Sequence, residues 1–198
     1  MRFALMLLLG LPGPARCGTI FGKDDRVPLG VLGAPWTAIG RLEREDGRFC
    51  TGTLVGPDIL LTAAHCLIDE QGRSYQGVVF RAFQTLGASV GESAVMDCKD
   101  EKSCRVGARL YKNNYGGDWA LGRLEKAIGQ TTMPVRPLAV MNEDTLRDSV
   151  LISVGYSEKI LDGVVPLAET GCKLRRAFRP HPALFNDCDI WQGMSGGP

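Results

Sequence analysis

Most of the chain is patterned as a series of short apolar runs, several of which alternate apolar and polar positions. Glycine, proline, asparagine or aspartate residues separate these runs. Alternation over a few residues is typical of a half-buried β-strand, and no long helical pattern competes with it. The first set of expected strands covers residues 36–42, 50–55, 59–62, 78–83, 106–111 and 119–124.

A second set of apolar runs follows a stretch at residues 126–137 that is punctuated by proline and glycine. The 25 glycines and 11 prolines of the chain suit many tight turns between short strands. The pattern therefore predicts an all-β protein of two modules, over residues 18–125 and 138–198, with residues 126–137 as the linker. The expected strands of the second module are 138–141, 150–156 and 171–178.

The first seventeen residues are predicted to be a secretory signal peptide. Arg2 supplies the positive start, residues 4–11 form a short apolar core, and a Pro-Gly-Pro sequence follows. The apolar core is too short to span a bilayer. Cleavage after Cys17 is favoured, with cleavage after Ala15 or a lipid anchor on Cys17 as alternatives. We therefore expect export to the periplasm or the medium, without stable insertion in a membrane.

The charge balance gives no indication of a polyanionic partner. The 198 residues carry a formal net charge of +1, and no long run of like charge is present. Nucleic-acid binding is therefore not expected. The length and the 44% hydrophobic content fit an ordinary globular protein, which we expect to be a monomer.

Three segments carry the candidate chemistry, in the order histidine, aspartate, serine. They are Thr62-Ala63-Ala64-His65-Cys66, Gly117-Asp118-Trp119-Ala120-Leu121 and Gly193-Met194-Ser195-Gly196-Gly197-Pro198. A serine becomes a strong nucleophile only with a base and an orienting acid beside it. The serine segment also fits the nucleophile elbow of α/β-hydrolases, but that fold places its acid and histidine after the serine. The order here disfavours the esterase interpretation.

Together these segments resemble the trypsin/chymotrypsin superfamily of serine endopeptidases, and their details favour its bacterial V8-like, glutamyl-endopeptidase-like branch. The resemblance covers roughly residues 20–198. It implies two antiparallel β-barrels, with His65 and Asp118 on the first and Ser195 on the second. The second barrel of the family continues beyond the serine, so we expect it to be incomplete in this chain. The chain is then a fragment or a truncated product that folds poorly or is inactive.

The resemblance also implies a role for each residue. His65 is the expected general base, Asp118 orients it, and Ser195 attacks the scissile carbonyl of a protein or peptide substrate. The N–H groups of Gly193 and Ser195 form the expected oxyanion hole. Neither a metal nor an organic cofactor is expected. The alternatives are a non-catalytic binding homologue that kept the fold and an inactive protease fragment.

Two positions differ from trypsin-like enzymes. Met194 stands where those enzymes carry an aspartate that pairs with a newly cut N-terminus, so activation by that ion pair is not expected. Asp189 lies six residues before the serine. At this position trypsin-like enzymes carry the carboxylate that binds the Arg or Lys side chain of the substrate. The joined Cys188-Asp189 instead resembles the V8-like block. Asp189 and Gln192 remain candidate substrate-binding residues, and the choice between basic and glutamate preference stays open.

Six of the seven cysteines remain after removal of the signal peptide, which allows fifteen pairings. Proximity and the resemblance narrow these to Cys50–Cys66, Cys98–Cys104 and Cys172–Cys188. A zinc site is disfavoured, because the short pair lacks the spacing of zinc ligands and has no histidine nearby. Three acidic residues of the same loop could bind calcium, but a charged surface loop is the preferred interpretation. They are Asp97, Asp100 and Glu101.

Overall fold

The computed structural model describes residues 18–30, 33–107, 115–129, 148–178 and 183–198. These residues form short strands and 3-10 turns, and none of them belongs to an α-helix. Within this part of the chain, no helix has the length and hydropathy needed to cross a membrane. The predicted signal peptide at 1–17, the expected strand at 138–141 and most of the predicted linker lie outside the described residues.

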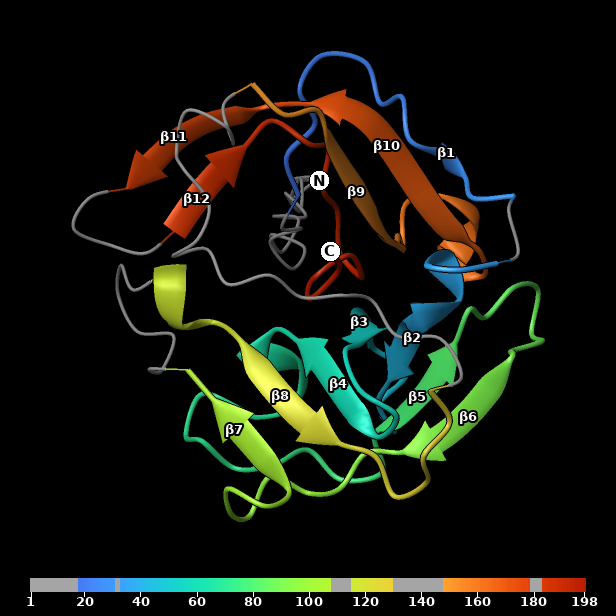
Figure 1. The fold of residues 1–198 in the computed structure, drawn as a ribbon, viewed down its shortest axis with the longest axis vertical. Helices are drawn as coiled ribbons and strands as arrows, with labels where there is room; N and C mark the ends of the chain where they lie inside the picture. The colour runs from blue at the N-terminus through green and yellow to red at the C-terminus, as the bar shows by residue number, and fades with distance from the viewer. Residues whose placement is uncertain (1–17, 31–32, 108–114, 130–147, 179–182) are drawn as a thin grey trace, which may run out of the picture.

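Seven antiparallel strands from the first part of the chain form one curled sheet, seen in the lower half of Figure 1. The strand order across the sheet is β6-β5-β2-β3-β4-β8-β7. Their bounds are β2 Ile39–Glu43, β3 Phe49–Leu54, β4 Ile59–Thr62, β5 Val79–Ala82, β6 Gly91–Ala94, β7 Cys104–Val106 and β8 Ala120–Arg123.

Backbone hydrogen bonds join the ends of β6 and β8 and close the curl of this sheet. Val95 and Leu124 form an isolated antiparallel bridge. The N–H of Met96 donates to the carbonyl of Arg123 at 2.8 Å, and the N–H of Glu125 donates to the carbonyl of Ala94 at 3.0 Å. Closure satisfies backbone groups that an open edge would expose, so the sheet takes a barrel-like form.

The interior of this sheet is filled by the apolar positions of the alternating runs. Leu42, Leu54, Leu60, Phe80 and Ala120 are each at most 1% exposed and belong to one cluster. Burial of a large apolar side chain contributes about 1.5–3 kcal/mol. The alternation that predicted these strands therefore also sets which of their side chains form the core.

Two smaller sheets, in the upper half of Figure 1, come mostly from the last part of the chain. The three-stranded sheet has the order β1-β10-β9, and β11 pairs with β12. The N-terminal strand β1 thus joins the C-terminal half of the molecule. The bounds are β1 Val27–Pro28, β9 Leu151–Tyr156, β10 Pro166–Cys172, β11 Leu174–Phe178 and β12 Ala183–Asn186.

Several strand boundaries differ from those expected. The single strand predicted at 171–178 is wrong, because β10 ends at Cys172 and β11 starts at Leu174. The register of β10 shifts between Thr170 and Cys172, where Gly171 has a φ of +96°. Such a backbone conformation interrupts a regular ladder. Likewise, β2 begins only at Ile39, because Trp36–Ala38 forms a 3-10 turn.

Candidate active site

His65 lies in a 3-10 turn, η2 Ala64–Cys66, directly after β4. The neighbours Ala64 and Cys66 are buried, whereas the His65 side chain keeps 45% of its surface exposed. A disulfide joins Cys66 to Cys50 in β3. The turn is therefore fixed to the sheet on both sides of the imidazole, while the ring itself faces solvent.

Asp118 reaches His65 because β4 and β8 are neighbouring antiparallel strands. Their register pairs Thr62 with Ala120, so the residues just before β8 lie beside those just after β4. The Nδ1 atom of His65 is 2.7 Å from Oδ2 of Asp118. The backbone N–H of His65 donates to Oδ1 of the same carboxylate at 3.1 Å. Two contacts thus fix the orientation of imidazole and carboxylate relative to each other.

The surroundings of Asp118 keep its carboxyl group ionised. Burial raises its pKa, but hydrogen bonds from the imidazole and N–H of His65 and from the N–H of Ala64 act in the opposite direction. The net result is a pKa below the ordinary value for aspartate. A carboxylate at neutral pH holds the Nδ1–H tautomer and leaves Nε2 free to accept a proton.

Ser195 lies in a turn that is docked against β3 and the segment before His65. The N–H of Thr51 donates to the carbonyl of Ser195 at 2.9 Å. A Cβ atom on Gly196 would lie 2.2 Å from Oγ1 of Thr62 and 2.7 Å from the nitrogen of Ala63. Only glycine fits this approach. The serine segment thus packs on the residues that lead into η2.

Within the described part of the chain, no hydrogen bond joins the Ser195 hydroxyl to His65. The structure thus brings the imidazole and the carboxylate together, and it packs the backbone of the serine turn on the residues before His65 without that contact. Catalytic hydrogen bonds are often long before substrate binds.

Several backbone N–H groups of the serine turn have no acceptor among the described residues. Those of Gly193 and Ser195, the expected oxyanion hole, are among them. Gly193 has a φ of +94°, and a Cβ there would lie 2.2 Å from the ring of Phe49. Glycine is therefore required for this backbone conformation. Unpaired N–H groups beside a serine hydroxyl can bind an anionic oxygen.

Thr51 anchors the backbone between those two donors. Its buried hydroxyl donates to the carbonyl of Gly193 at 2.8 Å and accepts from the N–H of Tyr156 at 2.9 Å. Tyr156 in turn donates its phenolic O–H to the carbonyl of Gln84 at 3.0 Å. One side chain of β3 therefore connects the serine turn, the β9 strand and the first sheet.

Replacing Thr51 with valine is expected to destabilise the protein by about 3 kcal/mol. Valine keeps the shape but leaves two buried backbone groups, on Gly193 and Tyr156, without a partner. Urea unfolding measures the loss of stability. The matched control is Thr53→Val, because the buried hydroxyl of Thr53 has no hydrogen-bond partner among the described residues. Equal losses in the two variants would contradict the role of Thr51.

Arg26 is a buried cation beside the serine turn that sequence reasoning missed. Its side chain has no exposed surface. Its Nη1 atom lies 2.8 Å from Sδ of Met194 and 3.2 Å from Oγ of Ser157. Its Nε and Nη2 atoms each lie 2.8 Å from the carboxylate of Asp24. The only signal in the sequence was the pair of aspartates directly before Arg26, which could pair with its guanidinium. Such a partner matters because arginine is rarely buried without one.

Asp189 is engaged inside the protein. It is 1% exposed, and its Oδ1 accepts the N–H of Phe21 at 2.7 Å. The substrate-binding role that the sequence suggested for Asp189 stays a prediction. Gln192, the other candidate, is partly exposed, and its carbonyl accepts the N–H of Glu158 at 2.9 Å. Its role in substrate binding stays a prediction.

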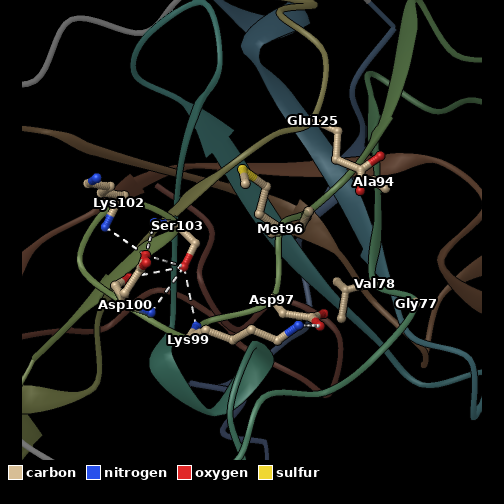
Figure 2. Close-up of a pocket in the computed structure, with 11 residues that line it drawn as sticks. Gly77, Val78, Ala94, Met96, Asp97, Lys99, Asp100, Lys102, Ser103 and Glu125 are labelled. Atoms are coloured by element: carbon tan, nitrogen blue, oxygen red, sulfur yellow. Dashed lines mark hydrogen bonds and ion pairs between the residues drawn. The ribbon is translucent and has the colours of Figure 1, made fainter.

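The three disulfides of the structure are Cys50–Cys66, Cys98–Cys104 and Cys172–Cys188. They are the pairs that the sequence suggested, and they remove these thiols as zinc ligands. The second closes a charged loop whose residues line a cavity of about 510 Å³, shown in Figure 2. Asp97 pairs there with Lys99, and Asp100 accepts the hydroxyl and N–H of Ser103. These contacts give Asp97 and Asp100 partners within the loop.

Comparison with known proteins places the chain in a family. The Trypsin family model matches residues 27–170. A trypsin-like protease of Streptomyces glaucescens is 30% identical over 162 residues, which cover 75% of this chain and 58% of the relative. The glutamyl endopeptidase of Bacillus licheniformis is 29% identical over 123 residues, covering 60% of this chain and 36% of that protein. The chain thus spans less than two thirds of the length of these relatives.

Solved structures show the same fold. A Glu endopeptidase in complex with MPD matches with a TM-score of 0.71 at 21% identity, covering 90% of this chain and 80% of that one. Protease Anisep from Arthrobacter nicotinovorans matches with a TM-score of 0.61 at 18% identity, covering 84% and 78%. The predicted all-β, trypsin-like fold is thereby confirmed. The chain belongs to the trypsin family of serine proteases, on its V8-like, glutamyl-endopeptidase-like side.

Proposed function

We propose that this protein is an exported serine endopeptidase that uses His65, Asp118 and Ser195 as its catalytic residues. The observation that carries the proposal is the ionised Asp118 carboxylate held 2.7 Å from Nδ1 of His65, beside a docked serine turn. Membership of the trypsin family and the relatedness to bacterial proteases support the same conclusion. The substrate class is a protein or peptide.

Acylation would begin with transfer of the Ser195 hydroxyl proton to Nε2 of His65. The serine oxygen forms a bond to the scissile carbonyl carbon, and the carbonyl electrons move to its oxygen. The N–H groups of Gly193 and Ser195 stabilise that negative charge. The imidazolium, stabilised by Asp118, then gives its proton to the leaving amine as the C–N bond breaks. The product is an ester on Ser195 and a free amine.

Deacylation would repeat the steps with water as the nucleophile. His65 takes a proton from water, and the hydroxide oxygen bonds to the ester carbon. Collapse of the second oxyanion breaks the bond to Ser195, which recovers its proton from His65. The acid product leaves and the free enzyme is restored. Every proton is thus transferred through one imidazole, so its orientation by Asp118 affects both halves of the reaction.

Labelling with a fluorophosphonate tests the nucleophile directly. We expect one label per molecule, at Ser195, and loss of both label and peptide hydrolysis in Ser195→Ala. The matched control is Ser89→Ala, which changes an exposed serine far from the turn in sequence. Labelling that persists in Ser195→Ala would refute the proposal. A folded wild-type protein that takes no label and cleaves no peptide in a library would instead support a non-catalytic homologue.

Export has its own test, because it depends on residues 1–17. Sequencing the N-terminus of protein recovered outside the cytoplasm is expected to find the chain starting at Gly18, after cleavage behind Cys17. Retention of the leader on protein that stays in the cytoplasm would contradict export.

A further inference from the structure

Three carboxylates from separate segments of the chain meet at one place near the serine turn. They belong to Asp25 before β1, Glu169 in β10, and Asp189 six residues before Ser195. One oxygen of each lies within 4.8 Å of the other two. Glu169 is 8% exposed and Asp189 1%, whereas Asp25 is exposed. Two of the carboxyl groups are therefore held inside the protein, and the third is exposed to solvent.

One oxygen of this cluster has no partner. Oδ1 of Asp189 accepts the N–H of Phe21, but Oδ2 is fully buried and makes no hydrogen bond to any described residue. The N–H of Asp189 donates to Oε2 of Glu169 at 2.6 Å, which holds the two residues together. A buried carboxylate oxygen is costly unless a donor, a proton or a cation satisfies it. Among the described residues, no donor or cation satisfies this buried oxygen of Asp189.

The neighbouring cations are already engaged. Arg26 makes two contacts of 2.8 Å with the Asp24 carboxylate, and Nζ of Lys159 lies 3.1 Å from the same group. Asp24 and the three clustered carboxylates carry four negative charges, against two positive charges on Arg26 and Lys159. Two negative charges thus remain without compensation, which matches the charge of one divalent cation.

The electrostatics at Glu169 agree with this count. Burial is the main cause that raises the pKa of Glu169, and the charges of Asp189 and Asp25 raise it further. The N–H of Asp189 and the charge of Arg26 act in the opposite direction without cancelling the effect. The carboxylate of Glu169 thus lies in a region of negative potential, where a cation would be favoured.

We propose that Asp25, Glu169 and Asp189 bind one divalent cation of the calcium class. The ligand set consists only of carboxylate oxygens, which hard cations such as Ca²⁺ prefer over zinc or copper. Calcium takes about six to eight oxygen ligands, and the exposed side at Asp25 allows water to supply the rest. The bound ion would join the N-terminal segment, β10 and the segment leading to Ser195. The sequence had indicated no metal and had raised calcium only for the disulfide-closed loop.

Calcium titration of the metal-free protein tests this site without any assay of hydrolysis. Protein treated with a chelator and dialysed is titrated with calcium chloride by isothermal calorimetry, and its Tm is measured with and without calcium. We expect one ion per chain and a Tm rise of about 5 °C at a hundredfold excess over Kd. A protein that binds calcium but does not cleave peptides would contradict the proposed endopeptidase activity and support the calcium site. The two proposals can therefore be tested independently.

Three variants locate the ion. Asp189→Asn is expected to abolish the calcium-dependent Tm rise. Asp25→Asn changes an exposed ligand and keeps the buried pair, so the fold is preserved and binding weakens by about tenfold or more. Glu101→Gln is the matched control, because Glu101 is an exposed acid of the other loop that could hold calcium. It is expected to bind calcium like the wild type.

Two results would overturn the proposal. The first is a wild-type protein whose Tm does not respond to calcium. The second is a calcium response that survives in both Asp25→Asn and Asp189→Asn, or that is lost in Glu101→Gln.

Discussion

Replacing Asp118 with asparagine is expected to lower kcat by about 10⁴-fold while leaving the protein folded. The amide oxygen can still accept the N–H of His65, which now donates to Oδ1 at 3.1 Å. The amide cannot stabilise an imidazolium and favours the wrong tautomer of the ring. Steady-state hydrolysis of a peptide substrate measures the loss, and circular dichroism measures the fold.

A second aspartate, next to the other end of the same pair of strands, gives the control for Asp118. Asp58 forms an ion pair with Arg123 at 2.6 Å, near the far end of the β4–β8 ladder. Asp58→Asn removes a carboxylate from the same sheet without touching His65, so kcat is expected to stay within about twofold, as for a typical surface ion pair. An Asp118→Asn variant with wild-type kcat would show that another residue orients the imidazole.

Replacing Arg26 with leucine is expected to destabilise the protein by about 3 kcal/mol and to lower kcat more than it changes KM. Removing one member of a buried ion pair leaves its partner uncompensated, and here the Asp24 carboxylate loses two close contacts. The support of the serine turn through Met194 is lost as well. Urea unfolding gives the first quantity and peptide hydrolysis the second.

The pH dependence of stability gives a separate readout for this pair. The hydrogen bonds from Arg26 are the main cause that lowers the pKa of Asp24 from 3.8 to about 2. A lowered folded-state pKa contributes stability that is fully present above the unfolded-state value and is lost as the pH falls to about 2. The free energy of unfolding of Arg26→Leu is therefore expected to fall less than that of the wild type between about pH 4 and 2, the window between the two pKa values of Asp24.

Arg73 gives the matched control for Arg26. Its side chain is 76% exposed, and its ion pair with Asp69 lies at the surface. Arg73→Leu is expected to change stability and kcat little, because exposed ion pairs contribute weakly. If Arg26→Leu behaved like Arg73→Leu, the buried guanidinium would have no part in holding the serine turn.

The strands that carry the catalytic candidates could be predicted from the sequence. The short runs at 50–55 and 59–62 correspond to β3 and β4, and the run at 119–124 corresponds to β8. These strands are predictable because each is a short run with apolar positions that is bounded by turn residues. Weakly patterned strands such as β6, which consists of Gly91-Glu92-Ser93-Ala94, could not be recognised, since their pairing depends on neighbours distant in sequence.

The candidate site was predictable only in part, for a similar reason. His65, Asp118 and Ser195 stand in short motifs whose order along the chain carries the information. Arg26 and Thr51 have no such motif, because their roles arise from contacts with residues 168 and 142 positions away. The burial of Asp189 follows from the N-terminal segment that covers it. Contacts over such separations are set by the tertiary fold, which a local pattern does not encode.

The β4–β8 ladder has a consequence for engineering. It fixes the imidazole and the carboxylate within one sheet, whereas the serine belongs to the other part of the chain. A chain cut within 126–137 would therefore yield one polypeptide with the acid–base pair and one with the nucleophile. Their reassembly would depend on the interface that Thr51 bridges. Recovered hydrolysis would then serve as a split reporter of association between the two polypeptides.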